Sequence, residues 1–240
     1  MIFRSIGVSL IVLLTLGNPA EGADPDKKPA RVSGKILFEG AVLPETAKLK
    51  TNENIDYCGE TVPSDRLLID RNSKGIKNAV VLLSPRQEES HPSSKKGEAI
   101  HALLNFHCRF APHVLVMKKG ESLFIKNGDP LLHSNHLYKG TKSLFNLAVT
   151  PGSEPIQKAI NEERELRLKC DIHDFMEAFI LVDPAPWSLI TDDKGAFNFG
   201  EVPPGPYRFS VWHETFDRLV VDLTLKPGEE RYLPLGVKPN

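Results

Sequence analysis

Short runs in which apolar and polar residues alternate recur along this chain, and most of them end near a glycine or a proline. Clear examples are RVSGKILFEG (31–40), SLFIKN (122–127), GAFNF (195–199) and PYRFSVW (206–212). Alternation with a period of two is typical of a strand that buries one face. The chain has 19 prolines and 17 glycines to make turns. The pattern therefore predicts an all-β fold built from sandwiches.

The remaining regions give weaker signals. Residues 158–168 are the only candidate for a helix of three turns, and residues 128–165 read mostly as loop. The stretch PRQEESHPSSKKGE (85–98) is rich in serine, proline and charge. Such composition is typical of a surface connection, so it predicts a boundary between two structural units.

Composition excludes several classes of function. The formal net charge is −1 and 40% of the residues are apolar, which is ordinary for a soluble globular protein. No basic patch indicates binding to nucleic acid or to a membrane surface. The sequence has no nucleophile elbow, no HExxH and no phosphate-binding loop, so we expect a protein that is not an enzyme.

The first 23 residues have the layout of a secretory signal peptide. One arginine is followed by an apolar run over residues 6–16 and then by small residues. That run is shorter than the roughly 20 residues of a membrane span. We expect a periplasmic or secreted protein that meets a membrane only if this segment is retained uncleaved. Residues 24–30 form a polar leader that we expect to be disordered.

The chain has three cysteines, Cys58, Cys108 and Cys170. An odd number in an exported protein leaves one thiol without a disulfide partner. A metal ion could hold that thiol as a thiolate and shield it from oxidation.

One cysteine begins a compact motif in KCDIHDFMEAFILVD (169–183), where Cys170, His173 and Met176 follow each other at intervals of three. Alternating or apolar, strand-like runs flank the motif on both sides. Two histidines, one cysteine and a weak axial methionine are the ligands of copper in electron-transfer sites. The motif therefore predicts a metal site on a loop between two strands.

A second imidazole must come from elsewhere. NGDPLLHSNHLY (127–138) offers His133 and His136, and the residues alone leave both open. Zinc is the chemical rival of copper at a Cys/His site. A thioether is a poor zinc ligand, so Met176 favours copper. The competing interpretation is a core methionine beside a surface histidine.

Several segments in order resemble the cupredoxins, the small blue-copper electron carriers. CDIHDFM has the compact ligand loop of the amicyanin type. Nearly the whole mature chain is similar to the bacterial plastocyanin-like or methylamine-utilisation proteins. The segments that carry this resemblance are YCGE (57–60), NAVVLL (78–83), CRFAPHVLVMKKGESLFIKNGDPLLH (108–133), LKCDIHDFM (168–176) and TDDKGAFNFGEVPPGPYRFSVWHE (191–214).

The resemblance implies one copper ion per chain, bound by His133, Cys170, His173 and Met176. His136 is the fallback for His133. In the family an asparagine commonly follows the first histidine ligand and braces the two ligand loops. Here that place is taken by Ser134, which puts the bracing in question. Taken with the odd number of cysteines, the resemblance also implies a disulfide between Cys58 and Cys108.

The tail TDDKGAFNFGEVPPGPYRF (191–209) resembles the carboxypeptidase-regulatory-like domain, a transthyretin-like β-sandwich. Such domains begin with strands like those before residue 98. We therefore expect a discontinuous sandwich of residues 31–98 and 186–240, with a cupredoxin domain of residues 99–185 inserted in it or adjacent to it.

The resemblance implies a one-electron carrier between redox partner proteins. We expect His173 to present an edge to solvent for electron passage, with Phe175 in a small apolar docking patch. The alternatives are a binding module without redox activity and a protein of copper storage or delivery. The sequence leaves the roles of His113 and His213 open.

Overall fold

The computed structural model describes residues 28–86 and 99–239 of the 240-residue chain. Within these ranges the regular structure is β-strand apart from one helix, α1 (Ile55–Cys58), so the all-β prediction is confirmed. The predicted signal peptide, residues 24–27 of the leader and residues 87–98 of the polar connection lie outside the described residues. The prediction of disorder is wrong for the last residue of the leader, since Ala30 is buried and begins the first strand. No helix among the described residues is long and apolar enough to cross a bilayer.

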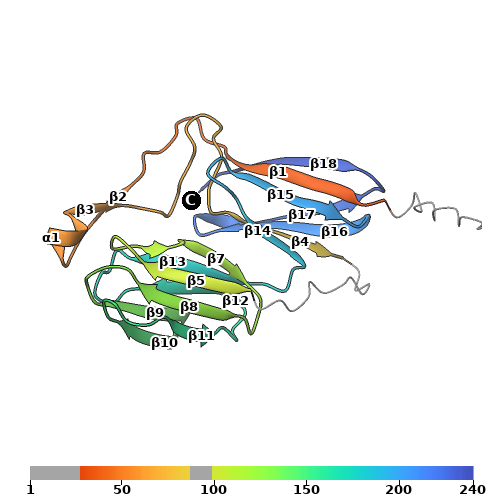
Figure 1. The fold of residues 1–240 in the computed structure, drawn as a ribbon. Helices are drawn as coiled ribbons and strands as arrows, with labels where there is room; N and C mark the ends of the chain where they lie inside the picture. Colours follow the sequence, from red (N-terminus) through yellow and green to blue (C-terminus); the bar gives the residue numbers. More distant parts are fainter. Residues whose placement is uncertain (1–27, 87–98, 240) are drawn as a thin grey trace, which may run out of the picture.

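Strands from both ends of the described chain form the first β-sandwich (Figure 1). Its sheets have the orders β15-β1-β18 and β14-β4-β16-β17. The strands are β1 (Ala30–Phe38), β4 (Val80–Pro85), β14 (Trp187–Ile190), β15 (Ala196–Val202), β16 (Gly205–His213), β17 (Phe216–Leu225) and β18 (Glu230–Val237). β1 pairs with β15 and β18, and β4 pairs with β14 and β16. Both sheets therefore combine residues from before 99 with residues from after 185.

The middle of the chain forms the second β-sandwich, with sheets of order β10-β9-β12-β13-β7 and β11-β8-β5-β6. The strands are β5 (Ile100–Asn105), β6 (Phe110–Ala111), β7 (Val114–Met117), β8 (Ser122–Asn127), β9 (His133–Lys139), β10 (Lys142–Val149), β11 (Ile156–Ala159), β12 (Arg164–Lys169) and β13 (Glu177–Val182). Alternate residues such as Leu123 and Ile125 of β8 enter its core. That core extends to Cys170 and Met176 at one end.

Two expectations about the middle of the chain are wrong. Residues 128–165 contain β9, β10 and β11 and are not mainly loop. The helix candidate at 158–168 contains the end of β11 and most of β12, where Leu166 and Leu168 are buried and Arg167 between them is exposed. This period of two lets the segment bury one face in the sandwich, and that burial outweighs the helix propensity of its glutamates, arginines and leucines.

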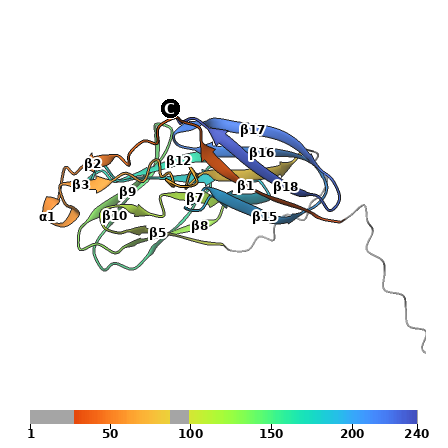
Figure 2. The ribbon, with the colours of Figure 1, turned by 90° about the horizontal axis from the view of Figure 1, so that it is seen from above.

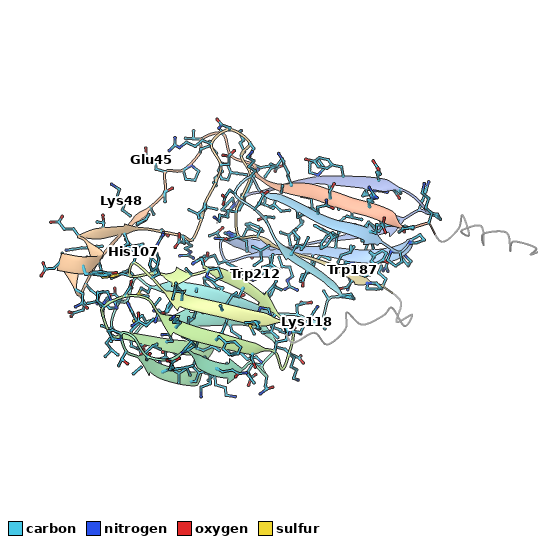
Figure 3. All side chains as sticks on the ribbon, viewed as in Figure 1. Glu45, Lys48, His107, Lys118, Trp187 and Trp212 are labelled. Atoms are coloured by element: carbon cyan, nitrogen blue, oxygen red, sulfur yellow. A yellow bond between two sulfur atoms is a disulfide. The ribbon has the colours of Figure 1, made fainter. Side chains whose placement is uncertain are left out.

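A third apolar cluster joins the two sandwiches. It contains Val80, Leu82, Val114, Phe179, Leu181, Ala185 and Trp212. Trp212 lies between the two sandwiches (Figure 3). Its ring lies 5.8 Å from that of Phe179, and its indole nitrogen donates a hydrogen bond to Glu165. The alternation of exposed and buried residues along β16 ends at Ser210. From there both faces of the strand are covered, one of them by the second sandwich.

Between β1 and β4 the chain leaves the first sandwich and runs to one end of the second (Figures 1 and 2). This arm carries β2 (Lys48–Lys50), α1 and β3 (Thr61–Pro63), and β2 pairs with β3. The disulfide predicted between Cys58 and Cys108 is confirmed, and it fastens the arm to the second sandwich. Part of the segment 31–98 therefore packs on the second sandwich, beside the loop that carries Cys170 and His173.

Candidate metal centre

Strand pairing brings the two candidate ligand segments together. β12 pairs with β9 in a register that places Lys169 opposite His136. The chain therefore delivers Cys170 beside the beginning of β9, where His133 lies. The turn after Cys170 carries His173 back over the same spot, so three ligand-type side chains meet at one end of the second sandwich.

The atoms that could bind a metal face one another. Cys170 Sγ lies 3.6 Å from His173 Nδ1 and 4.0 Å from His133 Nδ1. The two imidazole rings are 4.8 Å apart, and all three side chains are buried. Bonds of about 2.3 Å to sulfur and 2.0 Å to nitrogen, roughly 120° apart, place the two atoms about 3.7 Å from each other. The donor set therefore fits a single small metal ion.

Two backbone groups point at the sulfur. The amides of Ser134 and His173 each donate a hydrogen bond to Cys170 Sγ, at 3.4 Å in both cases. Hydrogen bonds of this kind disperse the charge of a thiolate, and at copper–thiolate sites they tune the redox potential. Each of the two loops that supply the imidazoles also supplies one of these donors.

The outer nitrogen of each imidazole has its own partner. His133 Nε2 lies 2.9 Å from Asp129 Oδ2, and His173 Nε2 lies 2.9 Å from Asn54 Oδ1. A carboxylate and an amide oxygen accept hydrogen bonds, so each ring carries its proton on Nε2. Each Nδ1 then directs its lone pair toward Cys170. Metal-binding histidines are typically oriented by such partners.

Burial keeps both imidazoles neutral. Desolvation lowers the pKa of His133 below its ordinary value, although the hydrogen bond and negative charge of Asp129 act in the opposite direction. Desolvation, and then the neighbouring His133, lower the pKa of His173. Only neutral imidazole binds a metal, so both rings are ready to bind near neutral pH.

Sequence reasoning missed Asp129 and Asn54. Asp129 is buried and, besides the His133 ring, it accepts hydrogen bonds from the hydroxyl of Tyr57 and from the amides of His107 and Cys108. In the sequence Asp129 belongs to NGDP, which reads only as a turn. The sole signal was its place four residues before His133. No pattern marked Asn54.

Met176 closes the turn that carries the other ligands. Its amide donates to the carbonyl of His173, and its own carbonyl accepts from the amide of Cys170. The side chain of Met176 is buried in the same core cluster as Cys170. The backbone of Met176 therefore closes the ligand turn, and its side chain packs in the core of the second sandwich; its predicted role as the axial ligand stays a prediction.

The fallback His136 does not join the cluster. Its ring is held by Asp171, Tyr138 and Ser143 on the surface of β9 and β10. The neighbouring Ser134 supplies the bracing that was in question. Its hydroxyl donates to Asn146 Oδ1 at 2.9 Å and accepts from the Asp171 amide at 3.3 Å.

The expectation that His173 presents an edge to solvent is wrong. Its exposed fraction is 0%, because Asn54 of the arm lies over the outer nitrogen. Phe175 is half-buried, with its ring 5.8 Å from that of His173. The face through which electrons were expected to pass is therefore covered by another part of the same chain.

The two histidines of unassigned role lie away from this centre. His113 pairs with Glu214, and both are buried between the sandwiches. His213 is also buried, and its Nδ1 contacts Thr215. Among the described residues, the one group of three or more ligand-type side chains is His133, Cys170 and His173.

No protein-family model and no curated protein matches this chain. Among solved structures, it is similar to a copper-containing nitrite reductase from Thermus scotoductus, with 18% identity over 35% of this chain and a TM-score of 0.32. The match spans only 22% of the reductase.

Small cupredoxins are also among the similar structures. A purple cupredoxin from Nitrosopumilus maritimus is 18% identical over 35% of this chain and 99% of its own, with a TM-score of 0.31. Amicyanin from Paracoccus versutus is 17% identical over 42% of this chain and 97% of its own, with a TM-score of 0.31. These are likenesses over part of the chain, so the metal centre stands on its own geometry.

Proposed function

We propose that this chain is a mononuclear copper protein of the blue type that carries single electrons between redox partner proteins. One observation supports this most strongly. The Nδ1 atoms of His133 and His173 both face the Cys170 sulfur, at 4.0 and 3.6 Å, in a site that is buried on all sides. Two imidazoles and one thiolate in this arrangement are typical of copper electron-transfer sites.

Copper suits this donor set better than zinc. A thiolate favours the reduced ion, and imidazole accepts either oxidation state. Bound copper would supply the one-electron change. The residues of the chain would hold the ion and keep its surroundings fixed. Asp129 and Asn54 orient the two imidazole rings, and burial excludes water. Met176, the predicted fourth ligand, would add a thioether, which is a poor ligand for zinc.

The same burial favours a carrier over an enzyme or a copper-delivery protein. His133, Cys170 and His173 are each at most 1% exposed. A substrate would need an open position on the metal, and a copper donor would need ligands that a partner can reach. A rigid, closed site instead keeps its geometry while the charge of the ion changes.

The strand pairing supports a modular architecture. We infer that residues 99–185 form a cupredoxin domain inserted into a carboxypeptidase-regulatory-like sandwich of residues 31–98 and 186–240. The pairing of β1 with β15 and β18 favours this arrangement. The arm 48–63 differs from this simple division into two units, since it leaves the first sandwich and packs on the second.

We also propose that the protein works in the periplasm or outside the cell. The signal-like residues 1–23 favour export. The disulfide between Cys58 and Cys108 is stable in such an oxidising compartment.

Copper titration tests the proposed function. One equivalent of Cu(II) added to the purified protein should produce an intense visible band from thiolate-to-copper charge transfer. Cys170→Ser should abolish this band. His136→Ala, which removes the histidine outside the cluster, is the matched control and should keep it. A wild-type protein that stays colourless with Cu(II) would contradict the proposed function.

A further inference from the structure

Residues 51–60, called the cap here, cover the outer side of the metal centre. The cap lies on the arm that leaves the first sandwich, and it contains α1 at the end of the second sandwich (Figures 1 and 2). Asn54 itself is exposed, whereas His173 directly beneath it has no exposed surface. Asn54 therefore separates the outer nitrogen of His173 from solvent.

The cap holds three consecutive residues of the ligand turn. Asn52 Nδ2 donates to the carbonyl of Ile172 at 3.0 Å, and Asn52 Oδ1 accepts from the amide of Asp174 at 3.3 Å. Between these two contacts, Asn54 Oδ1 accepts from His173 Nε2 at 2.9 Å. Two asparagines thus align the turn and fix the proton of its imidazole.

The cap is fastened to the other ligand segment as well. Cys58 is bonded to Cys108, and the hydroxyl of Tyr57 donates to Asp129, whose second oxygen holds His133. The cap also closes on itself, since the Thr51 hydroxyl donates to the Gly59 carbonyl. These contacts make the cap part of the walls of the metal centre.

We propose that Asn54 is a positioning residue of the metal centre, which fixes the proton and the orientation of the His173 imidazole from the cap. This inference rests on the proposed copper function. The orientation of His173 would then depend on a residue 119 positions away in the sequence.

The conformation of Asn54 allows a clean substitution. Its φ is 53°, a left-handed conformation that asparagine, aspartate and glycine tolerate. Asn54→Gly removes the acceptor without straining the backbone, and Asn54→Asp keeps an acceptor in place. Lys74 also has a positive φ, 59°, in an exposed turn of the first sandwich. Lys74→Gly is therefore the matched control.

The first readout needs no metal. Long-range ¹H–¹⁵N spectra of the histidine rings report which nitrogen carries the proton. In the wild type, Asn54→Asp and Lys74→Gly, His173 should be protonated on Nε2. In Asn54→Gly the ring should exchange between both tautomers. A single Nε2-protonated form in Asn54→Gly would overturn the role of Asn54.

The second readout uses the copper-loaded protein. Asn54→Gly should shift the charge-transfer band and the reduction potential, and copper loss to a chelator should be about 10- to 100-fold faster. Asn54→Asp should restore slow copper loss. If the wild type gives the band but all variants match it in spectrum, potential and copper loss, the inference fails while the proposed function stands. If the wild type gives no band, the proposed function fails.

Discussion

Asp129 and His133 form a fully buried pair, with 2.9 Å between Oδ2 and Nε2 and both side chains 0% exposed. Because the Asp129 carboxylate accepts the Nε2 proton, it orients the imidazole and makes Nδ1 a stronger ligand. The same carboxylate holds Tyr57 and the backbone beside the disulfide. One side chain therefore ties a metal ligand to the covering arm.

Replacing Asp129 with asparagine should weaken copper binding. Asp129→Asn keeps the size of the side chain but removes a negative charge next to His133. The affinity for Cu(II) should fall by about 10- to 100-fold. The reduction potential should rise, since the oxidised ion depends more on that charge than the reduced ion does. Competition titration and voltammetry measure the two effects, and an unchanged affinity would contradict the assigned role.

Removing the hydroxyl of Ser134 should loosen the contact between the ligand loops. Ser134→Ala deletes hydrogen bonds to Asn146 and to the amide of Asp171. The free energy of unfolding should fall by about 1 kcal/mol. Denaturant unfolding of the metal-free protein measures this loss. Ser143→Ala removes an exposed hydroxyl that hydrogen-bonds the ring of His136; it is the control and should be nearly neutral. Equal losses in both variants would argue against bracing by Ser134.

The disulfide between Cys58 and Cys108 should contribute strongly to stability. The two cysteines are 50 residues apart in the sequence. Closing a loop of that length in the unfolded chain corresponds to about 4 kcal/mol in the chain-entropy estimate. The double variant Cys58→Ser, Cys108→Ser should lose a stability of this order in denaturant unfolding. A loss below about 1 kcal/mol would mean that the arm stays in place without the covalent link.

His213 should make the protein less stable in acid. Burial lowers its pKa from 6.5 to about 4; a hydrogen bond with the backbone of Lys77 opposes this shift, and the charges of His113 and Arg66 add to it. Between these two pH values, His213 therefore binds a proton in the unfolded chain but stays neutral in the folded protein. Stability is complete above pH 6.5 and declines as the pH falls toward 4, by up to roughly 3 kcal/mol. His213→Asn should flatten the dependence of the unfolding free energy on pH in this window. Parallel curves for the two proteins would contradict the assignment.

The features that depend on residues close together in the sequence could be predicted from the sequence alone. The strands with clear alternation were predictable, and so was the loop from Cys170 to Met176, whose ligands lie three residues apart. β10 was missed because most of its residues are exposed or half-exposed, which removes the alternation. The choice of His133 over His136 came from the resemblance to the cupredoxins, and strand register accounts for it.

The covering of the centre could not be predicted in the same way. Asn54 reaches His173 only because an arm of the first sandwich packs on the second, 119 residues away along the chain. Asp129 looks like an ordinary turn residue until the fold buries it. Contacts of this kind depend on how separate units pack together, and they leave no periodic trace in the sequence.

Locating the metal tests the central claim most directly. Crystals of the copper-loaded protein, measured at the copper absorption edge, should show one strong anomalous peak per chain. That peak should lie within bonding distance of Cys170 Sγ, His133 Nδ1 and His173 Nδ1. A peak at another position, such as His136, or the absence of any peak after loading with one equivalent of copper, would contradict the account.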